Sequence, residues 1–398
     1  MSHNAPTRMN WNGKTLFRPP HQNGACDSTV PKYHYVPPQA GSAQGAWRTS
    51  GHFLDFKIPN QIGTIYALNW RFLVNVVAEA PDASGVVAPT NAPPTPFWIN
   101  QIEVSVGSTL IETIYSQDIY NETIGFLPID QLTAQAEALS YHGVLSEDGR
   151  NVSSDATLSA GDNTHYLPFN SALTTARLYA AGIAEDIKLR VYFPPGLFGS
   201  LVTLSDLTLV VEEDIGSSDD AAAWHESHKQ GIVYNTLVRQ RQSQMVSRVV
   251  GNSNTIDLTG LNGSSAGLLV YSGDGALPTK NTDLLVRYPI KEITLQDQMG
   301  NKKTEVLQAT WLKSFVWPDH IGTYFAAQQE AYLIPFSADF RKAVEDGINC
   351  GAVKMDGTDR LVIGPAVSTR VESVTITNYS YQSFVFVRGK LVSVIKRY

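Results

Sequence analysis

The sequence predicts an all-β protein built from two tandem β-sandwich domains, and three observations lead to this fold class. Only 17% of the 398 residues are charged and 43% are hydrophobic, so the chain can bury sizeable cores and has the composition of neither a disordered protein nor a coiled coil. Thirty glycines and 21 prolines indicate frequent turns, which connect strands more often than long helices. Apolar and polar residues alternate in many short segments, and one order of segments occurs twice.

The first 45 residues differ from the rest of the chain. Six prolines fall within the first 38 positions, and apolar residues show little periodicity there. Because proline fixes φ and removes a hydrogen-bond donor, we expect residues 1–45 to form an extended arm rather than a sheet or a helix. Two interpretations remain open, a solvated tail or an arm that docks on a neighbouring subunit. Aromatic residues favour docking slightly: Trp11, Phe17, Tyr33 and Tyr35.

Strand patterns fill the first half of the chain from about residue 50. The segments are rich in β-branched and aromatic residues or alternate with period two, which is typical of buried and half-buried strands. The expected strands are 53–58, 65–77, 98–106, 110–115, 166–169, 187–193 and 207–213. Helices are expected in this half at 129–141 and 172–185 only.

A helical linker is predicted at residues 217–230. A serine precedes two aspartates in its first turn, as helix N-termini prefer, and β-rich regions lie on both sides. In the second half, strands are expected at 268–271, 284–297, 331–336, 360–363, 371–377, 383–387 and 391–396, with a helix at 338–347. Asn-Gly and Asp-Gly pairs, which favour turns, lie at 262–263, 274–275, 346–347 and 356–357.

An internal repeat indicates that the two β regions are duplicates. In each half, a strand that ends in Pro-Phe leads into a short alanine-containing helical stretch and then into another strand. The two prolines, Pro168 and Pro335, are 167 positions apart, which is about one domain length. Because order and spacing recur together, the sequence predicts duplicated domains. The predicted division is an arm at 1–45, a first domain at 46–215, a linker at 216–231 and a second domain at 232–398.

The segments 331–363 and 374–395 carry a more specific pattern. It consists of an aromatic-Leu-x-x-Phe strand, a short helix, a Gly/Asn turn with a polar-apolar strand, and a closing strand that ends in glycine. The matching positions are Tyr332, Leu333, Phe336, Gly351, Leu361, Ile363, Asn378 and Gly389. In this pattern the chain resembles the C-terminal jelly roll of double jelly-roll major capsid proteins of tailless icosahedral DNA viruses. The segment 98–112 resembles the early strand pair of that family, so the resemblance covers about residues 46–398.

The resemblance implies two tandem jelly-roll β-sandwiches and a structural function. Three chains with two rolls each would form a homotrimeric, pseudo-hexameric capsomer of an icosahedral virion shell. The expected partners are further copies of the chain, with penton proteins, minor capsid proteins and an internal membrane as candidates, and the expected locations are the virion and, during assembly, the host cytoplasm. No enzymatic activity, catalytic residue, cofactor or metal ion is expected. Long loops should lie on the outer surface or between subunits: 80–96, 145–163 and 273–283.

The charge balance argues against direct nucleic-acid binding. The net charge is −7, and the nearest approach to a basic cluster, Arg239, Arg241 and Arg248, is spread over ten residues. Phosphate neutralisation needs clustered Lys and Arg, so no sequence-specific nucleic-acid binding is expected. The N-terminus has no apolar region of a secretory signal, and no stretch of 18 uninterrupted apolar residues occurs, so no transmembrane helix is expected.

Residues 263–267 match the G-x-S-x-G pattern, with Ser265 at its centre. Asp297 and His320 would complete the Ser–Asp–His order of a hydrolase. A nucleophile elbow needs a strand before the serine and a helix after it, whereas here a turn precedes and a strand follows. A glycine- and serine-containing hairpin loop is therefore favoured over a β-sandwich hydrolase.

His225, Glu226 and His228 lack the four-residue histidine spacing of a metalloprotease helix, so a solvated linker helix is favoured over a metal site. The acidic runs 212–214 and 219–220 are also expected to be solvated.

Two further groups of residues have simple interpretations. Four glycosylation sequons, which are expected to be unused without a secretory signal, begin at Asn121, Asn151, Asn262 and Asn378. Large aromatic residues are expected as core or interface anchors: Trp98, Trp311, Trp317, Phe315 and Tyr324. The alternative function from another class is a β-sandwich virion protein that binds a receptor or a carbohydrate.

Overall fold

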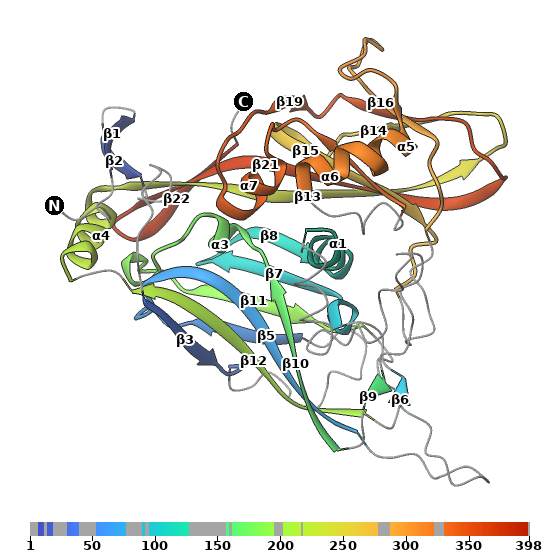
Figure 1. The fold of residues 1–398 in the computed structure, drawn as a ribbon. Coiled ribbons are helices and arrows are strands. Elements are labelled where there is room, and N and C mark those ends of the chain that lie inside the picture. Colours follow the sequence, from blue (N-terminus) through green and yellow to red (C-terminus); the bar gives the residue numbers. More distant parts are fainter. Residues whose placement is uncertain are drawn as a thin grey trace, which may run out of the picture.

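A computed structural model shows two β-sandwiches, one from each half of the chain, with helix α1 (Ser116–Phe126) lying between them (Figure 1). The first sandwich is coloured blue to green and the second yellow to red. The structure describes residues 7–11, 14–18, 30–39, 53–76, 90–91, 95–126, 157–158, 161–194, 202–215, 218–277, 287–321 and 330–396.

The first sandwich has the strand order of a jelly roll. Its strands are β3 (Val30–Val36), β4 (Phe53–Ile58), β5 (Thr64–Val76), β7 (Gln101–Val106), β8 (Thr109–Tyr115), β10 (Gly161–Phe169), β11 (Ile187–Tyr192) and β12 (Val202–Ile215). They form two antiparallel sheets with the orders β10-β5-β12-β3 and β4-β11-β7-β8. Of these eight described strands, the first, third, sixth and eighth in chain order therefore share one sheet, as in a jelly roll of two Greek keys.

The second sandwich repeats the same arrangement. Its strands are β13 (Ile232–Arg248), β14 (Asn254–Asp257), β15 (Asn262–Gly273), β16 (Glu292–Gln296), β17 (Leu307–Gln308), β18 (Ala331–Pro335), β20 (Arg360–Ile363) and β21 (Arg370–Val387). The sheet orders are β13-β21-β15-β18 and β14-β20-β16-β17. Strands β10 and β18, which carry Pro168 and Pro335, occupy equivalent places, so the predicted duplication is confirmed in the strand topology.

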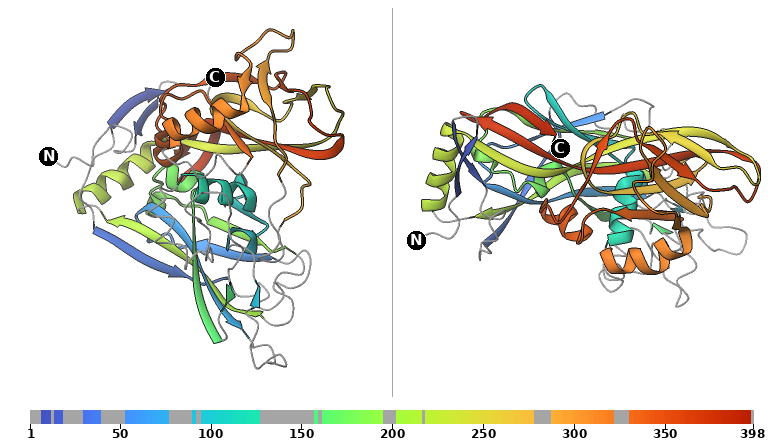
Figure 2. Two further views of the ribbon diagram at one scale, coloured as in Figure 1. Left: turned by 45° about the vertical axis from the view of Figure 1, so that its right-hand side comes forward. Right: turned by 90° about the horizontal axis from the view of Figure 1, so that it is seen from above.

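Further elements extend this framework. β19 (Val353–Asp356) pairs with β15, and β22 (Lys390–Lys396) pairs with β21. Figure 2 shows the long strands β13 and β21 from two further directions. The remaining short elements are β1 (Thr7–Trp11), β2 (Lys14–Arg18), β6 (Thr90–Asn91), β9 (Thr157–Leu158), η3 (Thr95–Trp98), η4 (Ala180–Gly182), α5 (Ala309–Trp311), η5 (Leu312–Val316) and α6 (Trp317–Ile321).

The expectation that residues 1–45 form no sheet is wrong for the described parts of this segment. β1 and β2 form a hairpin, and β3 pairs with β12 from Val36↔Leu209 to Val30↔Ile215. β3 is the edge of its sheet, and an edge strand needs backbone donors on one side only, which explains why Pro31 is tolerated. Our division of the chain into arm, rolls and linker remains a proposal.

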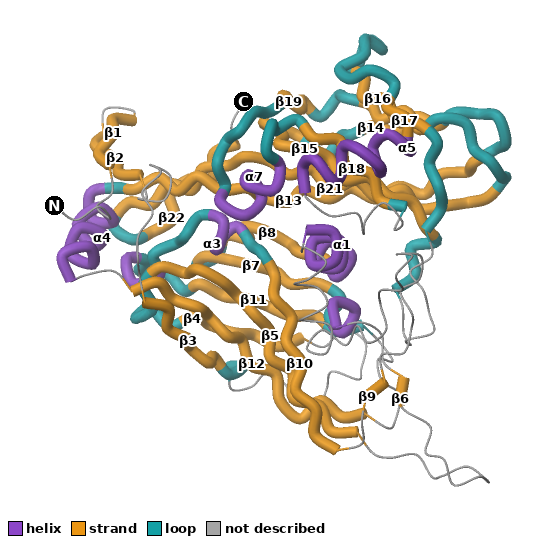
Figure 3. The backbone as a smooth tube through the Cα atoms, viewed as in Figure 1, coloured by secondary structure: helices purple, strands orange, loops and turns teal. Residues whose placement is uncertain are grey.

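The helix predictions have mixed outcomes (Figure 3). The predicted linker helix is α4 (Ser218–Gln230), and the helix predicted at 338–347 is α7 (Phe340–Asp346). The single helix predicted at 172–185 is wrong, because α3 (Ala172–Thr175) ends early and Arg177 has a positive φ of 50°. The prediction at 129–141 lies outside the described residues. The segments 371–377 and 383–387 belong to one strand, β21.

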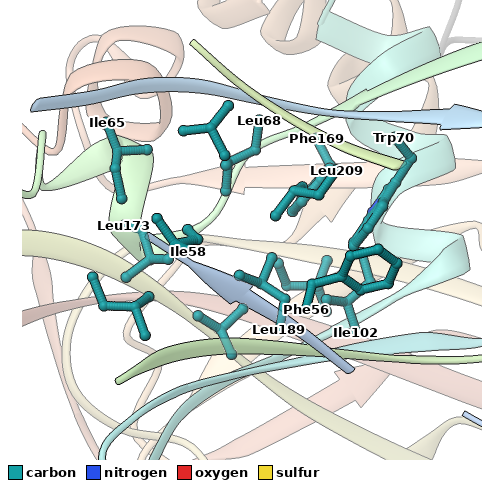
Figure 4. Close-up of a cluster of buried hydrophobic side chains, with 14 of the residues drawn as sticks. Phe56, Ile58, Ile65, Leu68, Trp70, Ile102, Phe169, Leu173, Leu189 and Leu209 are labelled. Atoms are coloured by element: carbon teal, nitrogen blue, oxygen red, sulfur yellow. The ribbon is translucent and has the colours of Figure 1, made fainter. Parts of the chain in front are cut away.

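The first sandwich buries its core between its two sheets (Figure 4). β5, which the sequence predicts as a strand from its apolar run, alternates buried and partly exposed residues over most of its length. Trp70 stacks on Phe169 with ring centroids 5.6 Å apart, and Phe56 meets the same indole edge-on at 4.8 Å. Each large apolar side chain buried in this way contributes roughly 1.5–3 kcal/mol relative to exposure. Across the described part of the chain, no helix has the length and apolar character needed to span a membrane.

Candidate functional site

The interface between the two sandwiches holds a network of buried polar side chains. Helix α1 belongs to the first roll and presents Gln117, Asp118, Asn121 and Glu122 to the second roll. All four side chains are buried. Their spacing places them on one face of the helix, so this polar face is directed inward rather than toward solvent.

The second roll meets α1 with one face of the sheet formed by β13, β21 and β15. In the register of these strands, Arg239 lies opposite Tyr379, Arg241 opposite Thr377, and Ser243 opposite Thr375. Paired residues on adjacent strands point to the same side of a sheet. The result is a ladder of polar side chains that faces α1.

Arg239 forms the centre of this interface. Its Nε and Nη2 donate to the two oxygens of Glu122 at 2.6 and 2.5 Å, and its Nη1 donates to Glu112 Oε1 at 2.8 Å. The Tyr379 hydroxyl donates to Glu122 Oε1 at 3.0 Å. Exposed fractions of the Arg239, Glu112 and Glu122 side chains are only 4%, 0% and 6%, so this is a fully desolvated ion cluster between the rolls.

The electrostatics of the cluster follow from this burial. Burial raises the pKa of the Glu122 carboxyl, and the attraction of Arg239 offsets this only in part. Burial also opposes the charge of Arg239, but the carboxylates of Glu122 and Glu112 outweigh it and raise the Arg239 pKa. Breaking a buried pair by removing one partner typically costs about 3–5 kcal/mol, because the other charge is left uncompensated.

A second contact of α1 involves Asp118. Thr377 Oγ1 donates to Asp118 Oδ1 at 2.8 Å, and Arg241 Nη1 lies 3.7 Å from Asp118 Oδ2. Arg241 Nη2 donates to Gln117 Oε1 at 2.7 Å. Helix α1 is therefore bound to β13 and β21 through several independent polar contacts.

The linker helix α4 forms a second joint between the rolls. His228 Nδ1 lies 2.8 Å from the Trp224 carbonyl, which can only accept, so the proton is on Nδ1. Nε2 then accepts from the Tyr234 hydroxyl at 3.1 Å, and that hydroxyl accepts from the Tyr179 backbone N–H at 3.2 Å. This chain of hydrogen bonds connects α4, β13 and the first roll.

The expectation of a solvated linker helix is wrong for one face of α4, which is buried at Trp224, Ser227 and His228. His228 is buried, and burial lowers its pKa to about 4. Gly182 of the first roll lies so close that an added Cβ would be 2.5 Å from the imidazole. Gly389 lies in the turn between β21 and β22, and a Cβ added to it would be 2.7 Å from the Gly182 carbonyl oxygen. The two glycines permit this close approach of the rolls.

The acidic run 212–214 is also not simply solvated. Glu213 is buried, accepts a hydrogen bond from the Gly63 N–H at 2.6 Å, and pairs with His34 of β3. This contact attaches β3 to the first roll. The pairing was not apparent in the sequence because His34 lies in the proline-rich segment.

The hydrolase arrangement, which the sequence disfavoured, does not form, and the hairpin loop expected in its place is wrong as well. Residues 263–267 lie in strand β15 rather than in a hairpin loop, and Ser265 is completely buried with its hydroxyl directed to the Gly267 carbonyl at 3.2 Å. Asp297 accepts from the backbone of Met299 and Asn301 in a turn after β16. His320 lies in α6. The structure does not bring these three residues together.

Other candidate residues are distributed through the fold. Among the residues that the structure describes, no group of His, Cys, Asp or Glu is arranged to hold a metal ion. The sequon residues Asn121 and Asn378 are buried, which agrees with unused sequons, whereas Asn151 lies outside the described residues. Trp98 and Trp317 are core residues as expected, but Trp311 and Phe315 are 49% and 61% exposed. Tyr324 is not among the described residues.

Two of the three predicted long loops, 80–96 and 145–163, are connected by a short β-ladder. β6, in the segment 80–96, pairs with β9, in the segment 145–163, through Thr90↔Leu158. This pair lies at the lower end of the first roll in Figure 1, away from the second roll. The third loop, 273–283, is described only as far as residue 277.

The inter-roll charges could be only partly recognised in the sequence. Arg239 and Arg241 are two positions apart in a strand, which places both on one face. Their acidic partners, Glu112 and Glu122, are more than 100 residues distant, and helix α1 was not predicted. Nothing in the local pattern links these residues.

Comparison with known proteins identifies the architecture. No sequence family and no curated protein matches the chain. PBCV-1 VP54, in a crystal structure fitted into a cryo-EM reconstruction of the virophage Sputnik, is 11% identical with a TM-score of 0.66 over 93% of this chain and 98% of that chain. The chain in a quasi-atomic model of the PBCV-1 virus capsid is 12% identical, with a TM-score of 0.68 over 93% of this chain and 98% of that chain. The Faustovirus major capsid protein is 8% identical with a TM-score of 0.58 over 91% of each chain.

These similarities extend across both sandwiches. The chain therefore has the double jelly-roll fold of these viral capsid proteins, and the resemblance noted in the sequence is confirmed at the level of fold.

Proposed function

We propose that this protein is a structural major capsid protein whose homotrimers form pseudo-hexameric capsomers of an icosahedral virion shell. The observation that carries the proposal is the pairing of two equivalent jelly rolls, held together by the buried ion cluster of Arg239, Glu112 and Glu122. Three such chains supply six similar sandwiches around a threefold axis. This arrangement approximates sixfold symmetry and can tile the face of an icosahedron.

The rigid joint between the rolls suits this role. A capsomer needs both rolls of each chain at a constant relative orientation, because closed symmetric assembly requires the same contacts in every copy. The inter-roll interface buries α1 and the linker residue His228 against the second roll. Their hydrogen bonds favour one orientation over others.

Exposed apolar side chains provide candidate contacts between subunits. Tyr33 and Tyr35 on β3 are 55% and 60% exposed, and Trp311 and Phe315 lie on the surface of α5 and η5. Large aromatic residues are enriched in the buried cores of protein interfaces. The loops 80–96, 145–163 and 273–283 are proposed to lie on the outer surface or between subunits.

The remaining parts of the proposal follow from the structural role. The protein would act without enzymatic chemistry, would reside in the virion, and would be assembled in the host cytoplasm. Its partners would be neighbouring capsomers, penton and minor capsid proteins, and an internal membrane. The fold similarity over both rolls favours this role over a receptor- or carbohydrate-binding protein.

Size measurement combined with electron microscopy tests the proposal. Three chains of 43.6 kDa would give a particle of about 131 kDa with a hexagonal outline in projection. Light scattering after size exclusion gives the mass, and negative-stain images give the outline. A monomer at micromolar concentration, or a slender fibre, would contradict the proposed function.

A further inference from the structure

A cavity of about 190 Å³ lies between the second roll and α1, which contributes Gln117 to its wall. Two arginines, Arg241 and Arg287, line it. The hydroxyl-bearing Ser243 and Thr375 and the glycines Gly273 and Gly275 also contribute to its wall. The cavity thus combines two positive charges with small polar side chains.

Arg241 is held in place but keeps a donor group available. Its Nη2 donates to Gln117, and its guanidinium lies over the Tyr115 ring, 4.3 Å from the centroid. Its Nη1 is buried and has no hydrogen-bond acceptor among the described residues, although Asp118 lies at 3.7 Å. A buried charged donor without an acceptor is costly, so a bound acceptor at this position would be stabilising.

Arg287 is also held in place. Its Nη2 donates to Asn121 Oδ1 at 2.5 Å, and its guanidinium lies over the Tyr271 ring, 4.5 Å from the centroid. Burial, together with the nearby positive charge of Arg241, lowers the pKa of Arg287. Two guanidinium groups therefore act on each other at the cavity, where the carboxylate of Asp118 offsets part of their positive charge and a bound anion would offset more.

The same face of the sheet supplies neutral hydrogen-bonding groups beside Arg241. Ser243 Oγ and Thr375 Oγ1 lie 2.9 Å apart on neighbouring strands and are hydrogen-bonded to each other. One hydroxyl donates in this bond, and the hydroxyl that accepts keeps its own proton for a bound acceptor. Gly273 and Gly275 have no side chains that would fill the cavity. Charged donors with hydroxyls beside them are suited to an oxyanion with several acceptor atoms.

We infer that this cavity binds a small tetrahedral oxyanion of the phosphate and sulfate class, between the guanidinium groups of Arg241 and Arg287 and the hydroxyls of Ser243 and Thr375. Because both arginines also bind α1, through Gln117 and Asn121, the anion would strengthen the contact between the two rolls. This inference does not depend on the proposed capsid role, since it concerns an interface within one chain.

Thermal unfolding of the full-length protein in sodium phosphate tests the inference. A ligand that binds the folded state alone raises stability with its concentration. We expect the unfolding temperature to rise with phosphate and to level off as the cavity fills. Sodium chloride at equal ionic strength should not reproduce this rise. Isothermal titration with inorganic phosphate should give one site per chain.

Two substitutions on one face of β13 make the test specific. S243D places a carboxylate at the cavity, where it should occupy the anion position and abolish the response to phosphate. S247D introduces the same charge four residues along the strand, at an exposed position outside the cavity wall, and should retain the wild-type response. R241K should keep the fold and weaken phosphate affinity by about tenfold, since a guanidinium makes two directed hydrogen bonds to a phosphate and an ammonium does not.

The outcomes are distinct. A phosphate-specific rise in the wild type and S247D that is lost in S243D would support the site. An equal rise in chloride, or a phosphate response that persists in a folded S243D protein, would overturn it. Elution volume and circular dichroism establish that each variant is folded before it is titrated.

Discussion

Arg239 of β13 and Glu122 of α1 form a two-pronged ion pair between the rolls, with Nε–Oε1 and Nη2–Oε2 distances of 2.6 and 2.5 Å. The two residues are 117 positions apart, and both are buried. Glu112 also pairs with Arg239, and the Tyr379 hydroxyl donates to Glu122. The pair therefore depends on the correct packing of one roll on the other.

Substitution of Glu122 by alanine should lower the free energy of unfolding by about 3–5 kcal/mol, because Arg239 would lose a buried partner. Urea unfolding of the purified chain measures this change. The control is E345Q, which removes the charge of an exposed pair with Arg341 on α7 and should cost less than about 1 kcal/mol. Equal effects of the two substitutions would show that the buried pair does not hold the rolls together.

The buried His228 predicts a pH-dependent stability. Its pKa is lowered by burial to about 4 from the ordinary histidine value of 6.5, so below pH 6.5 the unfolded chain binds a proton that the folded chain excludes. Stability should therefore fall as the pH decreases from about 6.5 to about 4, by up to roughly 3 kcal/mol from this group. Denaturant unfolding at several pH values gives the slope of the unfolding free energy against pH.

H228Q should reduce this slope, since it removes the titrating group. H225Q, at the exposed histidine three residues earlier on α4, is the matched control. It should keep most of the wild-type dependence, because burial is the largest cause of the lowered His228 pKa and the charge of His225 the smallest. If H228Q and the wild type have the same slope between pH 4 and 6.5, the assignment to His228 is wrong.

The contact of Gly182 with His228 predicts intolerance of a side chain. A Cβ at Gly182 would lie 2.5 Å from the imidazole, so G182A should force the rolls apart and cost about 1–3 kcal/mol by overpacking. G260A is the control, because its Cβ would meet only Gln242 Oε1, at 3.6 Å. Thermal unfolding measures the stability of both variants. If G182A unfolds at the wild-type temperature, the contacts around α4 can rearrange to make room for the added methyl group.

Two truncations distinguish the roles of the N-terminal residues. Deletion of residues 1–45 removes β3, leaves the β12 edge unpaired and deprives Glu213 of His34. The first roll should then be destabilised or fail to fold. Deletion of residues 1–29 retains β3, so the chain should fold and form trimers while shell assembly is impaired. Circular dichroism, sizing and assembly assays separate these outcomes. Normal assembly by the shorter deletion would contradict a docking role for the arm.

The exposed aromatic pair Trp311 and Phe315 predicts an effect on association but not on folding. The double substitution W311A/F315A should leave the unfolding temperature of the chain nearly unchanged and weaken assembly between subunits, because exposed anchors contribute mainly when a partner buries them. W317A is the contrasting variant. Trp317 is buried, and its loss should cost about 3–5 kcal/mol of folding stability. Unaltered association in W311A/F315A would exclude this surface from the interface.

The strands and the duplication could be predicted from the sequence because their signals are local. The alternation along β5 and β7 reports which face of each strand is buried. Pro168 and Pro335 mark equivalent strands in the two rolls. Two errors also had local causes. Pro31 concealed β3, and the Asn262-Gly263 pair indicated a turn where β15 begins, although Gly263 does have the positive φ that this pair favours.

The sequence alone determined the fold class, the approximate place of most strands and the duplication of the β-sandwich domain. These features depend on hydrophobic periodicity and turn residues, which can be recognised within a few neighbouring positions. Only the tertiary structure decided which polar residues matter. Glu112, Glu122 and Arg239 are ordinary charged residues in the sequence, and His228 is an ordinary helical histidine. Their burial depends on partners contributed by distant segments and makes them a joint between the two rolls. The same burial raises the pKa of Glu122 and lowers that of His228.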